Sequence, residues 1–263
     1  FKKMKVLVTG KNGFIGSNLI KKLKYHGYDT LGVGRDDFDL TNREETNNWF
    51  KNRNWDIVIH TAIVGGSRLK EDSKEIFFDN LSMFYNLISN KDKFSQLISF
   101  GSGAEKYNPT DPYGMSKNII NRIIKSEPQF NNVRIYGVFG EDEWDTRFIK
   151  SNIKRYINKE PLIIHQNKFM DFIYIDDLVL LVHYVIQNIE EKLIEANYVQ
   201  PYSLNDIALL INNLGYHKCE IKTEVEGMGE KYRGGYNHVK LPYTGLERGI
   251  KKVYEKLKYG EIN

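Results

Sequence analysis

An apolar run leads into three spaced glycines in the stretch Val6-Leu7-Val8-Thr9-Gly10-Lys11-Asn12-Gly13-Phe14-Ile15-Gly16. The run predicts a buried strand, and the glycines predict a tight turn that leads into a helix over residues 17–25. In such a turn, free backbone N–H groups and the positive end of the helix dipole face one point, where the usual ligand is a dinucleotide pyrophosphate. The alternative is a turn between a strand and a helix without a ligand.

The composition indicates a globular chain with a sizeable core and bounds its partners. The 263 residues are 41% hydrophobic and carry a formal net charge of +4. Because Lys and Arg are scattered among Asp and Glu, we expect no nucleic-acid partner. A single cysteine, Cys219, excludes an internal disulfide and makes a cytoplasmic location the default. We expect no membrane segment, since no apolar run could cross a bilayer, and no metal, since no histidine stands at a ligand spacing.

Strand and helix patterns alternate along the first half of the chain. Apolar runs predict further strands at 30–34, 38–40, 55–60, 96–100 and 133–136, with helices at 43–52 and 76–89 and from 113 onward. This alternation predicts an α/β fold in which a doubly wound parallel sheet carries helices on both faces.

The second half has a looser pattern. We expect a helix over 145–158, a short strand over 162–164, and a strand and helix within 169–187 that return to the main sheet. These patterns predict two domains. Residues 1–140 form a dinucleotide-binding domain to which 168–189 return, and 141–167 with 190–263 form a small C-terminal α/β substrate-binding domain, with the substrate site in the cleft between the domains.

The residues after the second strand bear on the choice of cofactor. Arg35, Asp36 and Asp37 follow that strand at its carboxyl end, where a bound dinucleotide has its adenosine ribose. A guanidinium there can pair with the 2′-phosphate of NADP, whereas an acid accepts the ribose hydroxyls of NAD. Because Arg35 comes first, NADP(H) is favoured, and Asp36 keeps NAD(H) possible.

A tyrosine and a lysine form the chemical centre of the sequence. Tyr113 and Lys117 are four residues apart at the start of a predicted helix, so that their polar ends can point into one cleft. A phenol has a reference pKa of about 10, and a nearby cation favours the phenolate. The pair therefore indicates an acid/base group that can work nearer neutral pH.

Taken with Ser102 at the end of the strand before them, these motifs resemble the extended short-chain dehydrogenase/reductase family, that is, the NAD-dependent epimerases and dehydratases of nucleotide sugars. The resemblance continues through Asn80, Arg134 and the segment 171–178 and implies a Rossmann-type fold. Three further matches are most similar to GDP-fucose synthase, with a general likeness to dTDP-4-dehydrorhamnose reductase: Arg35-Asp36, Asp39-Leu40 and Val64-Gly65-Gly66.

The resemblance implies a role for each matching residue. Tyr113 would exchange a proton with the sugar O4, Lys117 would bind the nicotinamide ribose, and Ser102 would hydrogen-bond the substrate oxygen. The implied cofactor-binding residues are Gly10, Asn12, Gly13, Phe14, Ile15, Gly16, Arg35, Asp39, Leu40, Thr61, Ala62, Asn80, Tyr113 and Lys117. The substrate-binding candidates are Gly66, Ser102, Glu105, Arg147 and Arg233.

Departures from the family pattern narrow the chemistry. GDP-fucose synthase also epimerises C3 and C5 with a Cys and a His, where this chain has Ala104 and Ile157, so we expect no such epimerisation. Dehydratases use an Asp-Glu pair, of which only Glu105 is present. Ser102 and Tyr113 are also only eleven residues apart. This short spacing predicts either an unusually open site or a sequence that lacks residues around Lys106 and Tyr107.

These observations favour an NADP(H)-dependent reductase that transfers hydride to C4 of a 4-keto nucleotide sugar and serves polysaccharide synthesis. One alternative is an NAD-dependent nucleotide-sugar 4-epimerase. Another is a sensor that binds a dinucleotide without chemistry. The resemblance also implies a homodimer that pairs through the helices carrying Asn80 and Tyr113.

Overall fold

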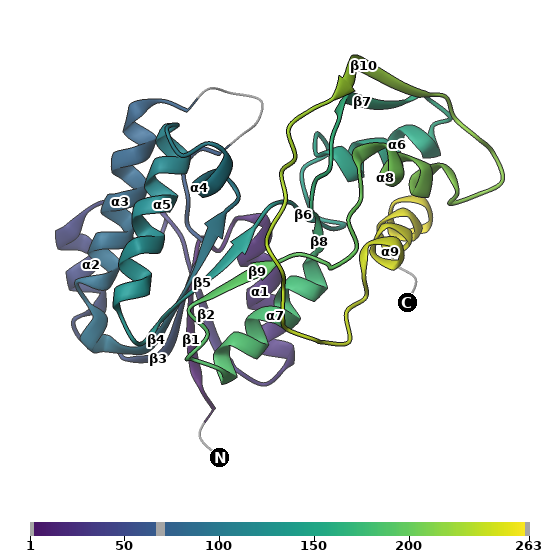
Figure 1. Cartoon of the computed structure of the whole chain (residues 1–263). Helices are drawn as coiled ribbons and strands as arrows, with labels where there is room; N and C mark the ends of the chain where they lie inside the picture. Colours follow the sequence, from purple (N-terminus) through teal and green to yellow (C-terminus); the bar gives the residue numbers. More distant parts are fainter. Residues whose placement is uncertain (1–2, 67–71, 261–263) are drawn as a thin grey trace. The chain divides into compact units, whose positions relative to one another are not determined.

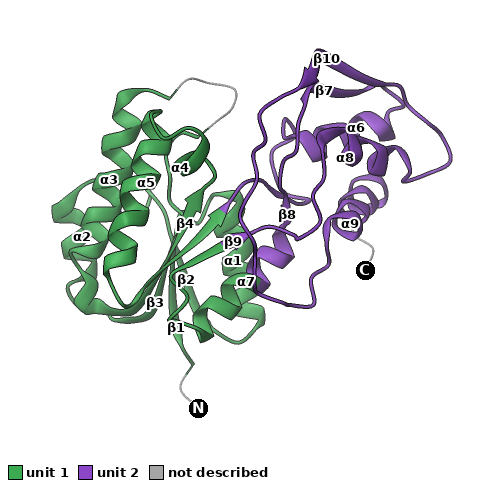
Figure 2. Ribbon diagram, viewed as in Figure 1, with its two compact units in different colours: residues 1–134, 181–194 green, residues 135–180, 195–263 purple. Residues whose placement is uncertain are grey.

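The computed structural model describes residues 3–66 and 72–260 of the chain, which form two compact units (Figure 2). The first unit contains residues 1–134 and 181–194 within these described ranges. The second contains residues 135–180 and 195–263. In the part of the chain that is described, no helix has the length and apolar character needed to span a membrane.

A six-stranded sheet organises the first unit. Its strands are β1 (Lys5–Thr9), β2 (Asp29–Val33), β3 (Trp55–His60), β4 (Phe94–Ser102), β5 (Phe130–Ile135) and β9 (Leu193–Ala196). They lie in the order β2-β1-β3-β4-β5-β9. Strand β1 pairs in parallel with both β2 and β3, and β3 pairs in parallel with β4. The predicted α/β fold with a parallel sheet is confirmed.

Helices connect these strands. They are α1 (Phe14–Tyr25), α2 (Arg43–Phe50), α3 (Lys74–Ile88), the short η1 (Lys91–Lys93), α4 (Ala104–Tyr107), α5 (Pro112–Ser126) and α7 (Ile175–Gln187). Helices α2, α3 and α5 lie side by side on one face of the sheet (Figure 1). Helix α1 lies on the other face next to the last turns of α7, where the His26 and His183 rings are 5.7 Å apart. The sheet is therefore doubly wound, as the alternation predicted.

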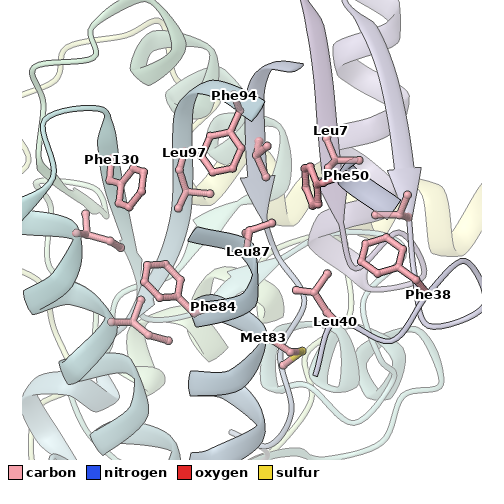
Figure 3. Close-up of a cluster of buried hydrophobic side chains, with 14 residues drawn as sticks. Leu7, Phe38, Leu40, Phe50, Met83, Phe84, Leu87, Phe94, Leu97 and Phe130 are labelled. Carbon is pink, nitrogen blue, oxygen red and sulfur yellow. The ribbon is translucent and has the colours of Figure 1, made fainter. Parts of the chain in front are cut away.

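A cluster of large apolar side chains joins the sheet to these helices. Figure 3 shows Leu7 and Leu97 from the strands packed with Phe84 and Leu87 of α3 and with Phe130. Each of these side chains is at most 1% exposed. Full burial of such a side chain stabilises the fold by about 1.5–3 kcal/mol, so this cluster holds the strands and the helices in one arrangement.

The strand predicted at 38–40 is wrong, because this segment is a loop. Phe38 and Leu40 are buried in the core, but side chains satisfy the local backbone groups in place of a neighbouring strand. Asp39 accepts the N–H of Thr41 at 2.9 Å, and Asn86 donates to the Leu40 carbonyl at 3.0 Å. An apolar-polar-apolar triplet therefore buries its ends without joining a sheet.

The second unit has two small sheets of its own. In one, β6 (Val138–Phe139) pairs in parallel with β8 (Ile173–Tyr174), and in the other β7 (Leu162–Asn167) pairs with β10 (Ile221–Met228). Its remaining helices are α6 (Phe148–Ile157), α8 (Leu204–Asn212) and α9 (Leu246–Tyr259).

The strand predicted within 169–187 to return to the main sheet is also wrong. That strand is β8, and it bonds to β6, while the sixth strand of the main sheet is β9. Helix α7 begins directly after Tyr174, so β8 is only two residues long. A short buried apolar run looks the same in either sheet, and only the tertiary structure distinguishes the two.

Candidate active site

The glycine turn requires its first and third glycines. Gly10 has a φ of +79°, and a Cβ on it would lie 2.8 Å from the Ala62 nitrogen beyond the end of β3. A Cβ on Gly16 would lie 2.2 Å from the Gly10 carbonyl oxygen. The turn therefore packs backbone against backbone, which brings the start of α1 close to the carboxyl ends of β1 and β3.

The first turn of α1 is open to an anion. Its N-cap is Gly13, which provides no side-chain hydrogen bond, and the first turn holds no acidic residue. The N–H groups of Phe14 and Ile15 have no acceptor within the helix, because the first four N–H groups of any α-helix lack one. Together with the helix dipole they form a cradle that fits the pyrophosphate of a dinucleotide.

A pocket of about 220 Å³ opens beside this cradle. Predicted cofactor residues that line it are Gly10, Gly13, Arg35, Asp39, Leu40, Thr61 and Ala62. Sequence reasoning missed Phe38, Ile63, Val64 and Met83, which line it too. Ile63 and Val64 directly follow Thr61-Ala62 and could have been found from that position. Met83 comes from the middle of α3, where no local pattern marks it.

Arg35, which follows the end of β2, lies at the edge of this pocket. Arg35 is exposed and lines the pocket, whereas Asp36 and Asp37 are not among its lining residues. Instead, the Lys11 Nζ lies 2.6 Å from Asp36 Oδ2 and 2.7 Å from Asp37 Oδ2. The acids that follow Arg35 are therefore engaged with a cation from the glycine turn.

Tyr113 and Lys117 lie in the first turns of α5, as predicted. The Lys117 Nζ is 5.9 Å from the centroid of the Tyr113 ring and donates to the Phe100 carbonyl at 2.7 Å. Lys117 is 5% exposed. Burial lowers the pKa of Lys117 from 10.5 to about 8, and the Glu105 carboxylate acts in the opposite direction. The ammonium therefore remains largely charged at neutral pH, close to the phenol.

Both the backbone and the side chain of Ser102 form hydrogen bonds within the protein. Its N–H donates to Glu105 Oε1 at 2.9 Å, and its Oγ accepts the N–H of Ala104 at 3.1 Å. The second Glu105 oxygen, Oε2, accepts from Arg134 Nη2 at 2.8 Å. Glu105 is 4% exposed, so both oxygens of this predicted substrate contact are engaged inside the protein.

The short connection between Ser102 and Tyr113 contains the single-turn helix α4. This helix packs against α5 at Gly114, where a Cβ would lie 1.9 Å from the Asn108 carbonyl oxygen and 2.8 Å from that of Ala104. The glycine beside Tyr113 thus allows the segment after Ser102 to approach α5 closely. The ten residues between Ser102 and Tyr113 close the connection in this way.

The loop that follows β3 contains Gly66 and is held by Asn80. The Asn80 amide accepts the Val64 N–H and donates to the Val64 carbonyl, both at 2.9 Å. Gly66 has a φ of +71°, and a Cβ on it would lie 2.8 Å from Cζ of Tyr113. Its N–H donates to Asp72 Oδ1 at 3.0 Å. The backbone of this loop therefore lies directly against the ring of the predicted acid/base.

The remaining candidates lie in the second unit. Arg233 donates from Nε to Asp171 Oδ1 at 2.7 Å, and Asp171 is 4% exposed. Arg147 is exposed and stands at the N-cap of α6. Over residues 3–66 and 72–260, no three His, Cys, Asp or Glu side chains gather in a way that could hold a metal ion.

Comparisons with known proteins identify the family of the chain. The model of the NAD dependent epimerase/dehydratase family matches residues 6–199. The GDP-L-colitose synthase of Yersinia pseudotuberculosis is 23% identical over an alignment of 272 positions, gaps included, which covers 87% of this chain and 88% of that protein.

Two solved structures have the same fold. One is a GDP-mannoheptose C4 reductase from Campylobacter jejuni with NADP bound, which has a TM-score of 0.80 and 19% identity over 97% of this chain and 98% of that one. The other is a UDP-glucose 4-epimerase from Thermus thermophilus in complex with NAD, with a TM-score of 0.80 and 16% identity over 97% and 99%.

The chain belongs to the NAD dependent epimerase/dehydratase family, because the family model matches most of its length. The predicted family is confirmed, and with it an enzyme that depends on a nicotinamide dinucleotide.

Proposed function

We propose that this protein is an NADP(H)-dependent reductase of a 4-keto nucleotide sugar, with Tyr113 as the acid/base. The observation that carries the proposal is the pair of Tyr113 and Lys117 on α5, in the same unit as the dinucleotide cradle. We further propose that the first unit binds the dinucleotide. The second unit, with Arg147 and Arg233, would then bind the sugar nucleotide.

The chemistry follows from three side chains. A bound nicotinamide supplies the hydride that adds to C4 of the sugar. As the carbonyl becomes an alcohol, the Tyr113 hydroxyl donates a proton to O4, and the Lys117 ammonium stabilises the negative charge left on the phenol. Ser102 Oγ accepts the Ala104 N–H, so that its own proton can be donated to O4 and orient the carbonyl.

The preference for NADP(H) rests on Arg35. This residue lines the pocket at the end of β2, where the adenosine ribose of a dinucleotide lies in this fold. Asp36, the residue that would accept the ribose hydroxyls of NAD, is instead bound to Lys11. This arrangement favours a ligand with a 2′-phosphate.

Arg35→Leu is expected to weaken NADPH binding by about 10- to 100-fold, since hydrogen bonds to charged groups contribute about 1.5–3 kcal/mol. NADH binding should change little, because NADH lacks the 2′-phosphate. Fluorescence titration of both cofactors measures the effect, with Arg122→Leu, an exposed arginine of α5, as the matched control. Equal loss for NADPH and NADH would contradict the assigned role of Arg35.

The second candidate is an NAD-dependent 4-epimerase, which the likeness to the Thermus enzyme and the presence of Asp36 favour. Such an enzyme should purify with NAD and show no net oxidation of added NADPH. The cofactor content of freshly purified protein therefore separates the two reactions. Retained NAD would support the epimerase, and an empty protein selective for NADPH would support the reductase.

We also propose that two copies pair through α3 and α5. Phe78 and Tyr85 of α3 are 64% and 55% exposed, and exposed apolar surface can mark a protein interface. Light scattering after size-exclusion chromatography should give twice the mass of the chain. Phe78→Glu should shift the protein towards the monomer, and a monomeric wild-type protein would refute the pairing.

A further inference from the structure

Lys11 ties together the two acids that follow Arg35. Its Nζ lies 2.6 Å from Asp36 Oδ2 and 2.7 Å from Asp37 Oδ2. Asp37 also accepts the Gly34 N–H at 2.8 Å and donates its own N–H to the Gly34 carbonyl, which closes the turn after β2. Both carboxylates therefore point to one ammonium from the glycine turn.

The side chain of Lys11 lies across two glycines. A Cβ on Gly32 would come within 3.0 Å of Lys11 Cβ, and one on Gly34 within 3.3 Å of its Cγ. The Lys11 N–H also donates to the Val33 carbonyl at 3.1 Å. Packing and backbone contacts thus hold this side chain in addition to its ion pairs. Hydrogen bonds to Asp36 and Asp37 raise the pKa of Lys11, so it stays charged at neutral pH.

The charge balance at this turn depends on Lys11. Without Lys11, the carboxylates of Asp36 and Asp37 would lose their ion-pair partner. Their negative charges, which lie next to Arg35, would then repel a 2′-phosphate. A released Asp36 could also turn to the ribose hydroxyls, as acids at the end of the second strand do in NAD-binding proteins. Loss of the Lys11 charge would therefore weaken the binding of NADPH and, at the same time, strengthen the binding of NADH.

We propose that Lys11 is a cofactor-specificity residue that acts by holding Asp36 and Asp37. It shields the 2′-phosphate position from their charge and keeps the Asp36 carboxylate away from the ribose. This inference rests on the proposed NADP(H) function. Selectivity for NADPH then requires two cations. Arg35 contacts the 2′-phosphate, and Lys11 neutralises the neighbouring acids.

Lys11→Met tests the proposal, because Met keeps the length of the chain and removes its charge. The ratio of the NADPH to the NADH dissociation constant should rise about fivefold, the size expected for exposed ion pairs. Both cofactors contain the pyrophosphate that binds near position 11, so any effect of the substitution on pyrophosphate binding cancels in this ratio. The ratio therefore reports the contribution of the 2′-phosphate. Lys21→Met on the exposed side of α1 should leave the ratio unchanged. The effect should shrink as salt rises, because exposed charges are screened.

A triple variant separates the proposed role from direct contact with the phosphate. Lys11→Met combined with Asp36→Asn and Asp37→Asn removes the acids together with their cation, and should return the ratio to within about twofold of the wild type. An unchanged ratio in Lys11→Met, or a triple variant as impaired as the single one, overturns the inference. A wild-type protein that prefers NADH overturns the proposed function instead, so the two failures are distinguishable.

Discussion

Tyr113→Phe should lower the turnover number by about 10²- to 10⁴-fold, the usual contribution of a positioned general acid. The change removes one oxygen and keeps the ring that lies against Gly66, so the loop after β3 keeps its packing. Binding of NADPH should stay within about threefold of the wild type, because the cradle at Gly13 and the pocket at Arg35 are untouched. Single-turnover oxidation of bound NADPH, followed at its absorbance maximum, measures the chemical step.

The same variant also tests the sensor alternative. A protein that only binds a dinucleotide has no use for a phenol beside a buried ammonium, so its ligand affinity and its downstream response would both survive Tyr113→Phe. As a control for the loss of a tyrosine hydroxyl, Tyr107→Phe on α4 should keep its turnover. If Tyr113→Phe retained full turnover, the proposed acid/base role would be wrong.

Local signals predicted the parts of the site that depend on the backbone. Position 10 has a positive φ, and position 16 has no room for a Cβ. Both positions therefore require glycine, which is visible in the sequence as spaced glycines. The strand at 55–60 was predicted with its observed bounds, because the apolar run Ile57-Val58-Ile59 marks its centre. Tyr113 and Lys117 share one helix, so their proximity also follows from local geometry.

Pairings between distant residues could not be predicted in this way. Glu105 meets Arg134 across 29 positions, and Lys11 meets Asp36 across 25, with no periodicity that links the partners. Met83 reaches the pocket beside the glycine turn only because α3 packs on the sheet. Such contacts depend on tertiary structure, so the sequence could offer Glu105 as a structural or substrate contact but could not predict its ion pair with Arg134.

Arg134→Met should destabilise the first unit by about 3–5 kcal/mol, the typical cost of leaving one partner of a buried ion pair alone. The Glu105 side chain is 2% exposed and that of Arg134 is 12% exposed, so water cannot replace the lost guanidinium. Glu105 would keep the N–H of Ser102 and the electrostatic attraction of the Lys117 ammonium, but would lose its ion-pair partner. Thermal and urea unfolding, monitored by circular dichroism, measure the loss.

A double variant determines whether the uncompensated charge is the cause. Arg134→Met with Glu105→Gln removes the charge and keeps an amide oxygen that can accept the Ser102 N–H, so most of the lost stability should return. Glu105→Gln alone leaves Arg134 buried without its anion and should be less stable than the double variant. This order of stabilities would show that the ion pair is needed because both groups are buried. A loss below about 1 kcal/mol in Arg134→Met would contradict the account.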